Sequence, residues 1–122
     1  MSTFKKIEDI EVWQKARSLT KSVYDLFKNS PQLKRDFTLK DQAFRATFSI
    51  MLNIAEGFAR NTDKEFTQFL YIAKGSASEL KSIFYILKDT SLISSDTFND
   101  FYGKISEVEK MLSGLISYLK RK

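Results

Sequence analysis

Two mostly apolar segments, 49–60 and 66–80, carry the polar side chains that are best suited to chemistry. An acid–base enzyme would need a concave pocket around Glu56 and Lys74, with the pKa values of both groups strongly shifted. The alternative is a hydrogen-bond network that fixes the helix register or a subunit contact, and we favour it because no evident nucleophile accompanies these residues. The predicted polar network consists of Asn53, Glu56, Gly57, Arg60, Lys74, Gly75 and Glu79.

The composition removes most other catalytic chemistry. The chain of 122 residues contains no histidine and no cysteine. It therefore lacks the commonest general base, the commonest transition-metal ligand, thiolate nucleophiles and disulfides. Neither a Gly-x-Ser-x-Gly motif nor a phosphate-binding glycine loop is present. We predict a protein without enzymatic activity, metal or cofactor.

Basic residues are unevenly distributed along the chain. The net charge is +5, with eleven basic and seven acidic residues in 1–61, six basic and eight acidic in 62–119, and three basic residues at the end. This distribution fits either a surface that meets a polyanion or an ordinary solvated lysine surface. The candidate nucleic-acid-binding residues are Lys5, Lys6, Lys15, Arg17, Lys21, Arg45, Lys120, Arg121 and Lys122.

Aromatic side chains offer a second route to nucleic acid. Five of them could stack on bases beside lysines: Trp13, Tyr24, Tyr71, Tyr85 and Tyr102. At helical spacing, however, aromatic residues more often pack in a core or an interface. We favour the core or interface for this group.

Apolar residues recur with helical periodicity and predict an all-α fold, an antiparallel up-down four-helix bundle in one domain, 1–122. The first helix should end at Pro31, and a charged connection should occupy 33–37. We expect Thr38 with Asp41, and Thr62 with Glu65, to cap the next two helices. The predicted helices cover 11–29, 38–59, 63–90 and 95–120.

The second predicted helix is apolar on nearly all sides, from Ala43 to Ala55. A helix of this kind must bury more than one face, which predicts a subunit contact as well as a core contact. At Gly57 either the helix ends or the backbone approaches a neighbour closely. Gly75, in mid-helix, indicates close helix packing.

Three separated blocks, 7–16, 49–57 and 64–76, resemble the 23S rRNA intervening-sequence protein family, also called the S23 ribosomal or four-helix-bundle protein family. They read Ile-Glu-Asp-Ile-Glu-Val-Trp-Gln-Lys-Ala, Ser-Ile-Met-Leu-Asn-Ile-Ala-Glu-Gly and Lys-Glu-Phe-Thr-Gln-Phe-Leu-Tyr-Ile-Ala-Lys-Gly-Ser. The resemblance implies a small bacterial helical bundle without established enzymatic activity. Related accessory variability proteins of diversity-generating retroelements imply a basic homopentamer that contacts a reverse transcriptase and nucleic acid.

The sequence departs from the family pattern in the second helix. Of two arginines that are usual there, only Arg45 is present, and the usual proline after Ile50 is replaced by Met51. If the missing arginine contacts RNA in relatives, this chain binds RNA more weakly. Phe44 and Leu52 instead fit a more hydrophobic interface.

These observations lead to two functional hypotheses. The first is a homo-oligomer, with five subunits implied by the resemblance, that binds structured RNA or DNA through repeated basic patches. The second is a scaffold whose oligomer recruits a partner protein without touching nucleic acid. We expect no membrane span, and a cytoplasmic location because no signal-peptide pattern is present.

Overall fold

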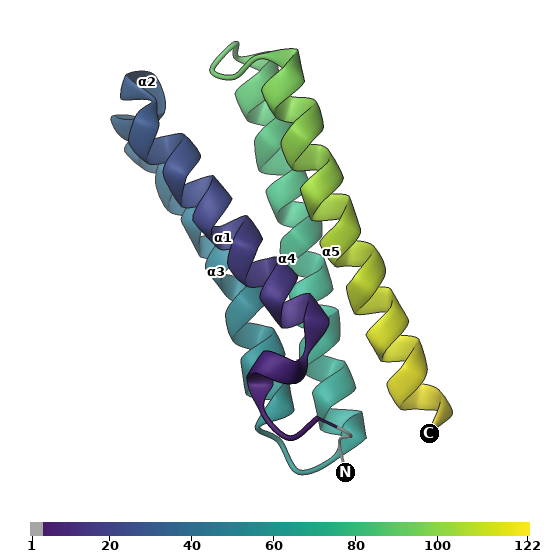
Figure 1. Cartoon of the computed structure of the whole chain (residues 1–122). Helices are drawn as coiled ribbons and strands as arrows, with labels where there is room; N and C mark the ends of the chain where they lie inside the picture. Colours follow the sequence, from purple (N-terminus) through teal and green to yellow (C-terminus); the bar gives the residue numbers. More distant parts are fainter. Residues whose placement is uncertain (1–3) are drawn as a thin grey trace.

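The structure is a computed structural model that describes residues 4–122 (Figure 1). Every regular element in this range is helical, and the all-α prediction is confirmed. Four long helices share one apolar core, an arrangement compatible with a bundle. The elements are η1 (Ile7–Asp9), α1 (Glu11–Asn29), α2 (Pro31–Lys34), α3 (Phe37–Phe58), α4 (Asp63–Asp89) and α5 (Ser95–Arg121).

The connection between α1 and α3 differs from the predicted charged link over 33–37. Helix α1 ends before Pro31 as predicted, but Ser30 then accepts a hydrogen bond from the Leu33 amide and begins the short helix α2. Proline is well suited to the first position of a helix, where its missing N–H is not needed. Leu33 is fully buried. The link is therefore a part of the core as well as a connection.

Polar side chains cap three of the four long helices, whereas α1 follows Ile10 and has no side-chain cap. Asp36 accepts a hydrogen bond from the Leu39 amide and caps α3, so the predicted Thr38 cap was wrong by two residues. Thr62 caps α4 as predicted, with its hydroxyl accepting from the amide of Glu65. Ser94 caps α5 in the same way. Each cap satisfies an amide that would otherwise lack a partner at the helix start.

The core lies between the four long helices. Helix α3 packs against α1 and α4, and α5 packs against α4. On α4 and α5, most apolar residues that recur with helical spacing are buried, and Phe84 of α4 stacks on Phe101 of α5 with ring centroids 4.8 Å apart. The apolar residues that recur with helical spacing in the sequence therefore form the core.

A second apolar face of α3 is left uncovered. The core side of this helix buries Ala46, Ile50 and Ile54, whereas Phe48 and Leu52 on the outer side are 40% and 64% exposed. Because α3 is apolar on both sides, one chain alone does not bury all of its apolar surface.

The glycines behave in two ways. A Cβ atom added at Gly57 would lie 2.8 Å from both Phe66 Cδ1 and Phe69 Cβ, which confirms a close approach between α3 and α4. At Gly75 an added Cβ would meet nothing within 4 Å, so the predicted close packing there is wrong within the chain. Gly75 instead leaves an open, exposed position on α4.

Within residues 4–122, no helix combines the length and the hydropathy needed to span a bilayer.

Candidate nucleic-acid interface

The predicted polar network divides into two groups, and the first ties α3 to α4. The Asn53 side chain donates hydrogen bonds to the Ser49 carbonyl at 2.8 Å and to the Ser49 hydroxyl at 3.0 Å. The hydroxyls of Ser49 and Ser76 share a hydrogen bond of 2.7 Å between the two helices. This group satisfies its own polar atoms and fixes the level at which α3 and α4 meet.

The second group lies at the surface of α3. Glu56 forms an ion pair of 2.9 Å with Arg60, whose guanidinium lies over the Phe69 ring. Among the described residues, neither Lys74 nor Glu79 forms a hydrogen bond or ion pair with this group or with Asn53. The structure therefore does not assemble Glu56 and Lys74 into one acid–base site.

A more enclosed ion pair joins α4 to α5, and the sequence did not single it out. Lys81 pairs with Glu109, and their side chains are only 21% and 19% exposed. The Ser78 hydroxyl donates to Glu109 at 3.1 Å, and the Lys81 ammonium lies 4.4 Å from the centre of the Tyr102 ring. Burial acts to lower the pKa of Lys81, but the Glu109 carboxylate raises it above the usual value. Lys81 therefore stays charged and serves as a structural tie.

Five of the nine predicted nucleic-acid-binding residues lie near the chain termini. The described N-terminus and the C-terminus lie at the same end of the molecule, so Lys5 and Lys6 share that end with Lys120–Lys122 (Figure 1). Lys122 pairs with Asp63 at 3.1 Å, and Lys120 donates to the Tyr71 hydroxyl at 2.9 Å. Arg121 is exposed.

The other four predicted residues lie on α1 and α3. Lys15 pairs with Glu107, Lys21 with Asp25 and Arg45 with Asp41, all through exposed ion pairs. Exposed pairs of this kind contribute little stability and exchange readily with other partners. The Arg17 guanidinium lies 5.8 Å from the centre of the Trp13 ring. Three of these four residues thus already have a carboxylate partner within the chain.

A pocket between α1 and α3, called the α1–α3 pocket below, brings positive charge and aromatic rings together. It lies at the end of the molecule opposite the chain termini (Figure 1). Its volume is about 130 Å³, and its lining includes no carboxylate. Lys40 of α3 donates to the Lys34 carbonyl at 3.1 Å, which ties the start of α3 to α2. Buried Leu33 fixes α2 in place and so positions Lys34. The pocket is lined by Tyr24, Phe27, Lys28, Lys34, Lys40 and Phe44.

A row of rings crosses the pocket from α1 to α3. Tyr24 stacks on Phe44, and Phe44 stacks on Phe48, each with centroids 5.6 Å apart and planes inclined by 21°. Phe27 meets Phe44 edge-on and anchors the row to the core. The ends of the row remain accessible, with Tyr24 49% and Phe48 40% exposed.

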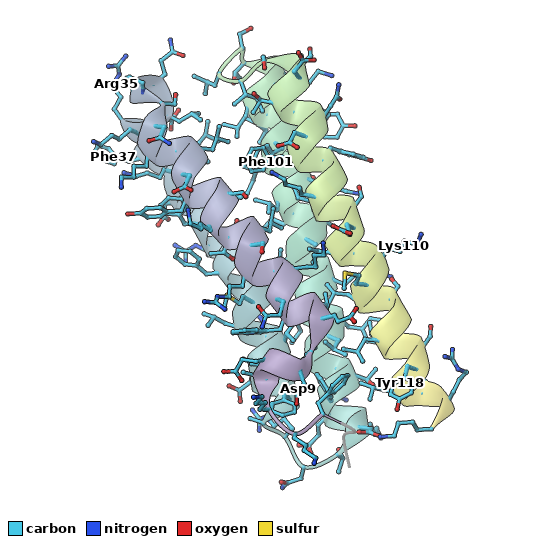
Figure 2. All side chains as sticks on the ribbon, viewed as in Figure 1. Asp9, Arg35, Phe37, Phe101, Lys110 and Tyr118 are labelled. Carbon is cyan, nitrogen blue, oxygen red and sulfur yellow. The ribbon has the colours of Figure 1, made fainter. Side chains whose placement is uncertain are left out.

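A second hollow adjoins this pocket and shares Lys40 and Phe44 with it. Its volume is about 520 Å³. Phe37 lines it, is 73% exposed, and has the Lys40 ammonium 4.9 Å from its ring centre. Figure 2 shows Phe37 beside Arg35 at the α2 end of the molecule, far from Tyr118. One carboxylate, Asp41, also lines this hollow, and it is paired with Arg45. The aromatic surface therefore extends around this end, with one lysine and one aspartate beside it.

The hollow between α1 and α5 has the opposite character. It is larger, about 630 Å³, and three aspartates line it with a single lysine, Lys104. The carboxylates are those of Asp25, Asp96 and Asp100. A polyanion would be repelled from this hollow and attracted to the α1–α3 pocket.

The prediction missed the three lysines of the pocket, Lys28, Lys34 and Lys40. Lys28 follows Tyr24 by four residues, and Lys40 precedes Phe44 by four. Side chains four apart lie on one helix face, so pairing each lysine with an aromatic residue at this spacing would have found two of them. Lys34 had no such signal because its position depends on the unexpected helix α2.

No group of three or more His, Cys, Asp or Glu side chains between residues 4 and 122 is placed to hold a metal ion.

Comparison with known proteins places the sequence in a family. The model of the 23S rRNA-intervening sequence protein family matches residues 8–114. A solved structure from Bacteroides thetaiotaomicron, a protein of unknown function from the S23 ribosomal protein family, is 24% identical with a TM-score of 0.80. The match covers 86% of this chain and 97% of that one, and it supports the same fold. The curated proteins contain no match. Because the family model spans most of the sequence, the chain belongs to the 23S rRNA-intervening sequence protein family.

Proposed function

We propose that this protein is a non-catalytic, cytoplasmic homo-oligomer that binds RNA or DNA through basic surface repeated in each subunit. The observation that carries the proposal is the α1–α3 pocket, where three lysines converge and no carboxylate lines the surface. Lysines bind phosphates as point charges and release the counterions of the nucleic acid, which favours binding to any sequence. The family name adds a link to ribosomal RNA genes.

Several features argue against catalysis. Glu56 is engaged in an exposed ion pair with Arg60, and Lys81 is held in its charged form by Glu109. The charged Lys81 ammonium has no free lone pair to act as a general base, and exposed Glu56 forms no hydrogen bond or ion pair with Lys74. The polar groups of the structure serve as ties between helices instead.

The uncovered apolar surface supports self-association. Leu52 is 64% and Ile72 51% exposed, on the adjacent helices α3 and α4. We propose antiparallel up-and-down order for the long helices, supported by the short connections and by the Ser49–Ser76 bond. In that order Leu52 and Ile72 lie at one level and form a continuous apolar strip. A second copy of the chain that covers this strip would begin an oligomer, for which we propose five subunits.

Binding to a structured ribosomal RNA fragment tests the nucleic-acid function. Fluorescence anisotropy across a salt series should show affinity that falls steeply as salt rises. The variant Lys28→Gln/Lys40→Gln should bind more weakly and reduce the slope of log K against log salt by about 1–2, because each lost phosphate contact removes about 0.7–0.9.

The matched control removes two lysines from α5. Lys104→Gln/Lys110→Gln makes the same change in charge, but Lys104 lines the acidic hollow and Lys110 is exposed on the same helix. This control should retain most of the affinity. Equal losses in both variants would show that only net charge matters. No binding at low salt would overturn the proposal and favour the scaffold that recruits a partner protein.

The oligomer is tested separately by sedimentation velocity. Leu52→Glu/Ile72→Glu should shift the protein from a single oligomeric species to the monomer, because two carboxylates would have to be buried in each contact. Circular dichroism should be unchanged, since both side chains are exposed in one chain. A monomeric parent protein would refute self-association through this strip.

A further inference from the structure

We propose that the α1–α3 pocket binds an unpaired segment of a polynucleotide, with a base stacked on Tyr24 and flanking phosphates held by Lys28, Lys34 and Lys40. This inference rests on the proposed function and adds the strand type that the site selects. The structural basis is the coincidence of exposed stacked rings with three lysines that line one pocket, since a site for phosphate alone does not need the rings.

The ring row provides a rigid stacking surface. Tyr24 is held in place by Phe44, which is itself fixed by an edge-on contact to buried Phe27. A base that stacks on Tyr24 therefore extends an existing stack and orders few new side-chain torsions. Stacking does not discriminate strongly among bases, because every base offers a π face.

The lysines are placed to neutralise the backbone on each side of the stacked base. Lys28 lies on α1, four residues beyond Tyr24, whereas Lys34 and Lys40 approach from α2 and α3. The pocket shares Lys40 and Phe44 with the hollow of about 520 Å³, where Phe37 offers a further exposed ring and the carboxylate of Asp41 is paired with Arg45. A strand can therefore continue from Tyr24 towards Phe37 beside Lys40.

A duplex cannot use this surface fully. Its bases are already stacked on each other and enclosed by two backbones, so the lysines could meet phosphates while Tyr24 found no free base. The proposal thus separates two contributions. The charge term is shared by single and double strands, and the stacking term belongs to single strands alone.

Single strands of DNA and of RNA, about ten nucleotides long and carrying one 2-aminopurine, are the probes for this site. We expect a change in 2-aminopurine fluorescence on binding, which reports stacking. We also expect affinity at least about 5-fold above that for a duplex of equal phosphate number, since stacking on one ring contributes this much or more. The same measurement with the DNA strand and with the RNA strand shows whether the site prefers deoxyribose or ribose. Polyphosphate serves as a competitor that has phosphates but no bases.

Substitutions at Tyr24 separate stacking from charge. Tyr24→Leu should lower single-strand affinity about 5-fold or more and abolish the fluorescence change, while leaving the salt slope and duplex affinity unaltered. Tyr24→Phe should retain both signals, because the ring persists. The half-exposed position of Tyr24 favours folding of both variants, which circular dichroism checks.

The outcomes distinguish the two proposals. Salt-dependent binding with equal affinity for single strands and duplexes, unchanged by Tyr24→Leu, would overturn the stacking site and leave the general nucleic-acid function standing. Absence of binding to every probe would overturn both. Full displacement by polyphosphate at matched charge, with no fluorescence change at any stage, would also exclude base stacking.

Discussion

Replacing Gly57 by alanine should destabilise the protein by about 1–3 kcal/mol, the usual effect of inserting a methyl group into a filled space. The added Cβ would lie 2.8 Å from Phe69 Cβ and 3.1 Å from the Phe66 carbonyl oxygen. Both of these atoms are fixed by the backbone of α4, so no side-chain rotation relieves the contact. The helices must move apart, and the surrounding core contacts weaken with them.

Urea unfolding at a fixed subunit concentration measures this effect, because self-association also contributes to apparent stability. Gly103→Ala is the matched control. Gly103 is exposed on α5, and an added Cβ there meets nothing within 4 Å. The better helix propensity of alanine should therefore stabilise the protein by about 0.5–1 kcal/mol. If Gly57→Ala and Gly103→Ala changed the free energy of unfolding by the same amount and in the same direction, the close approach at Gly57 would be contradicted.

The contrast between these glycines shows where sequence reasoning reached its limit. Helical periodicity located the long helices because burial on one face imposes a spacing that can be read directly. A glycine in a helix carries no such spacing. Gly57 and Gly75 both interrupt apolar segments, yet only Gly57 meets a neighbouring backbone. The difference depends on which helix lies opposite, and this is a property of the tertiary structure.

The candidate site illustrates the same limit at the level of charge. Sequence analysis could count basic residues and note that Tyr24 was able to stack on a base. It could not show that Arg45 pairs with Asp41, or that Lys34 and Lys40 converge beside Tyr24. Convergence depends on α2, whose four residues are too few to display a helical period. Short connecting elements thus decide the position of the lysines that matter most here.

Leu33→Ala should lower the free energy of unfolding by about 2–5 kcal/mol, the range for truncating a fully buried leucine. Leu33 is the one side chain of α2 that enters the core, and the helix is held against α1 and α3 through it. Urea unfolding of this variant is compared with Gln32→Ala, which changes an exposed neighbour in the same short helix and should shift stability by less than about 0.5 kcal/mol.

The same substitution links stability to the candidate site. Without Leu33, α2 loses its anchor while Asp36 still caps α3, so Lys34 is freed and Lys40 stays in place. We therefore expect Leu33→Ala, at temperatures where it remains folded, to weaken nucleic-acid binding by less than Lys28→Gln/Lys40→Gln does. A loss of stability below about 1 kcal/mol would mean that the link packs only loosely on the core. The core would then end at α1 and α3, and the position of Lys34 would have to be set by its contact with Lys40 alone.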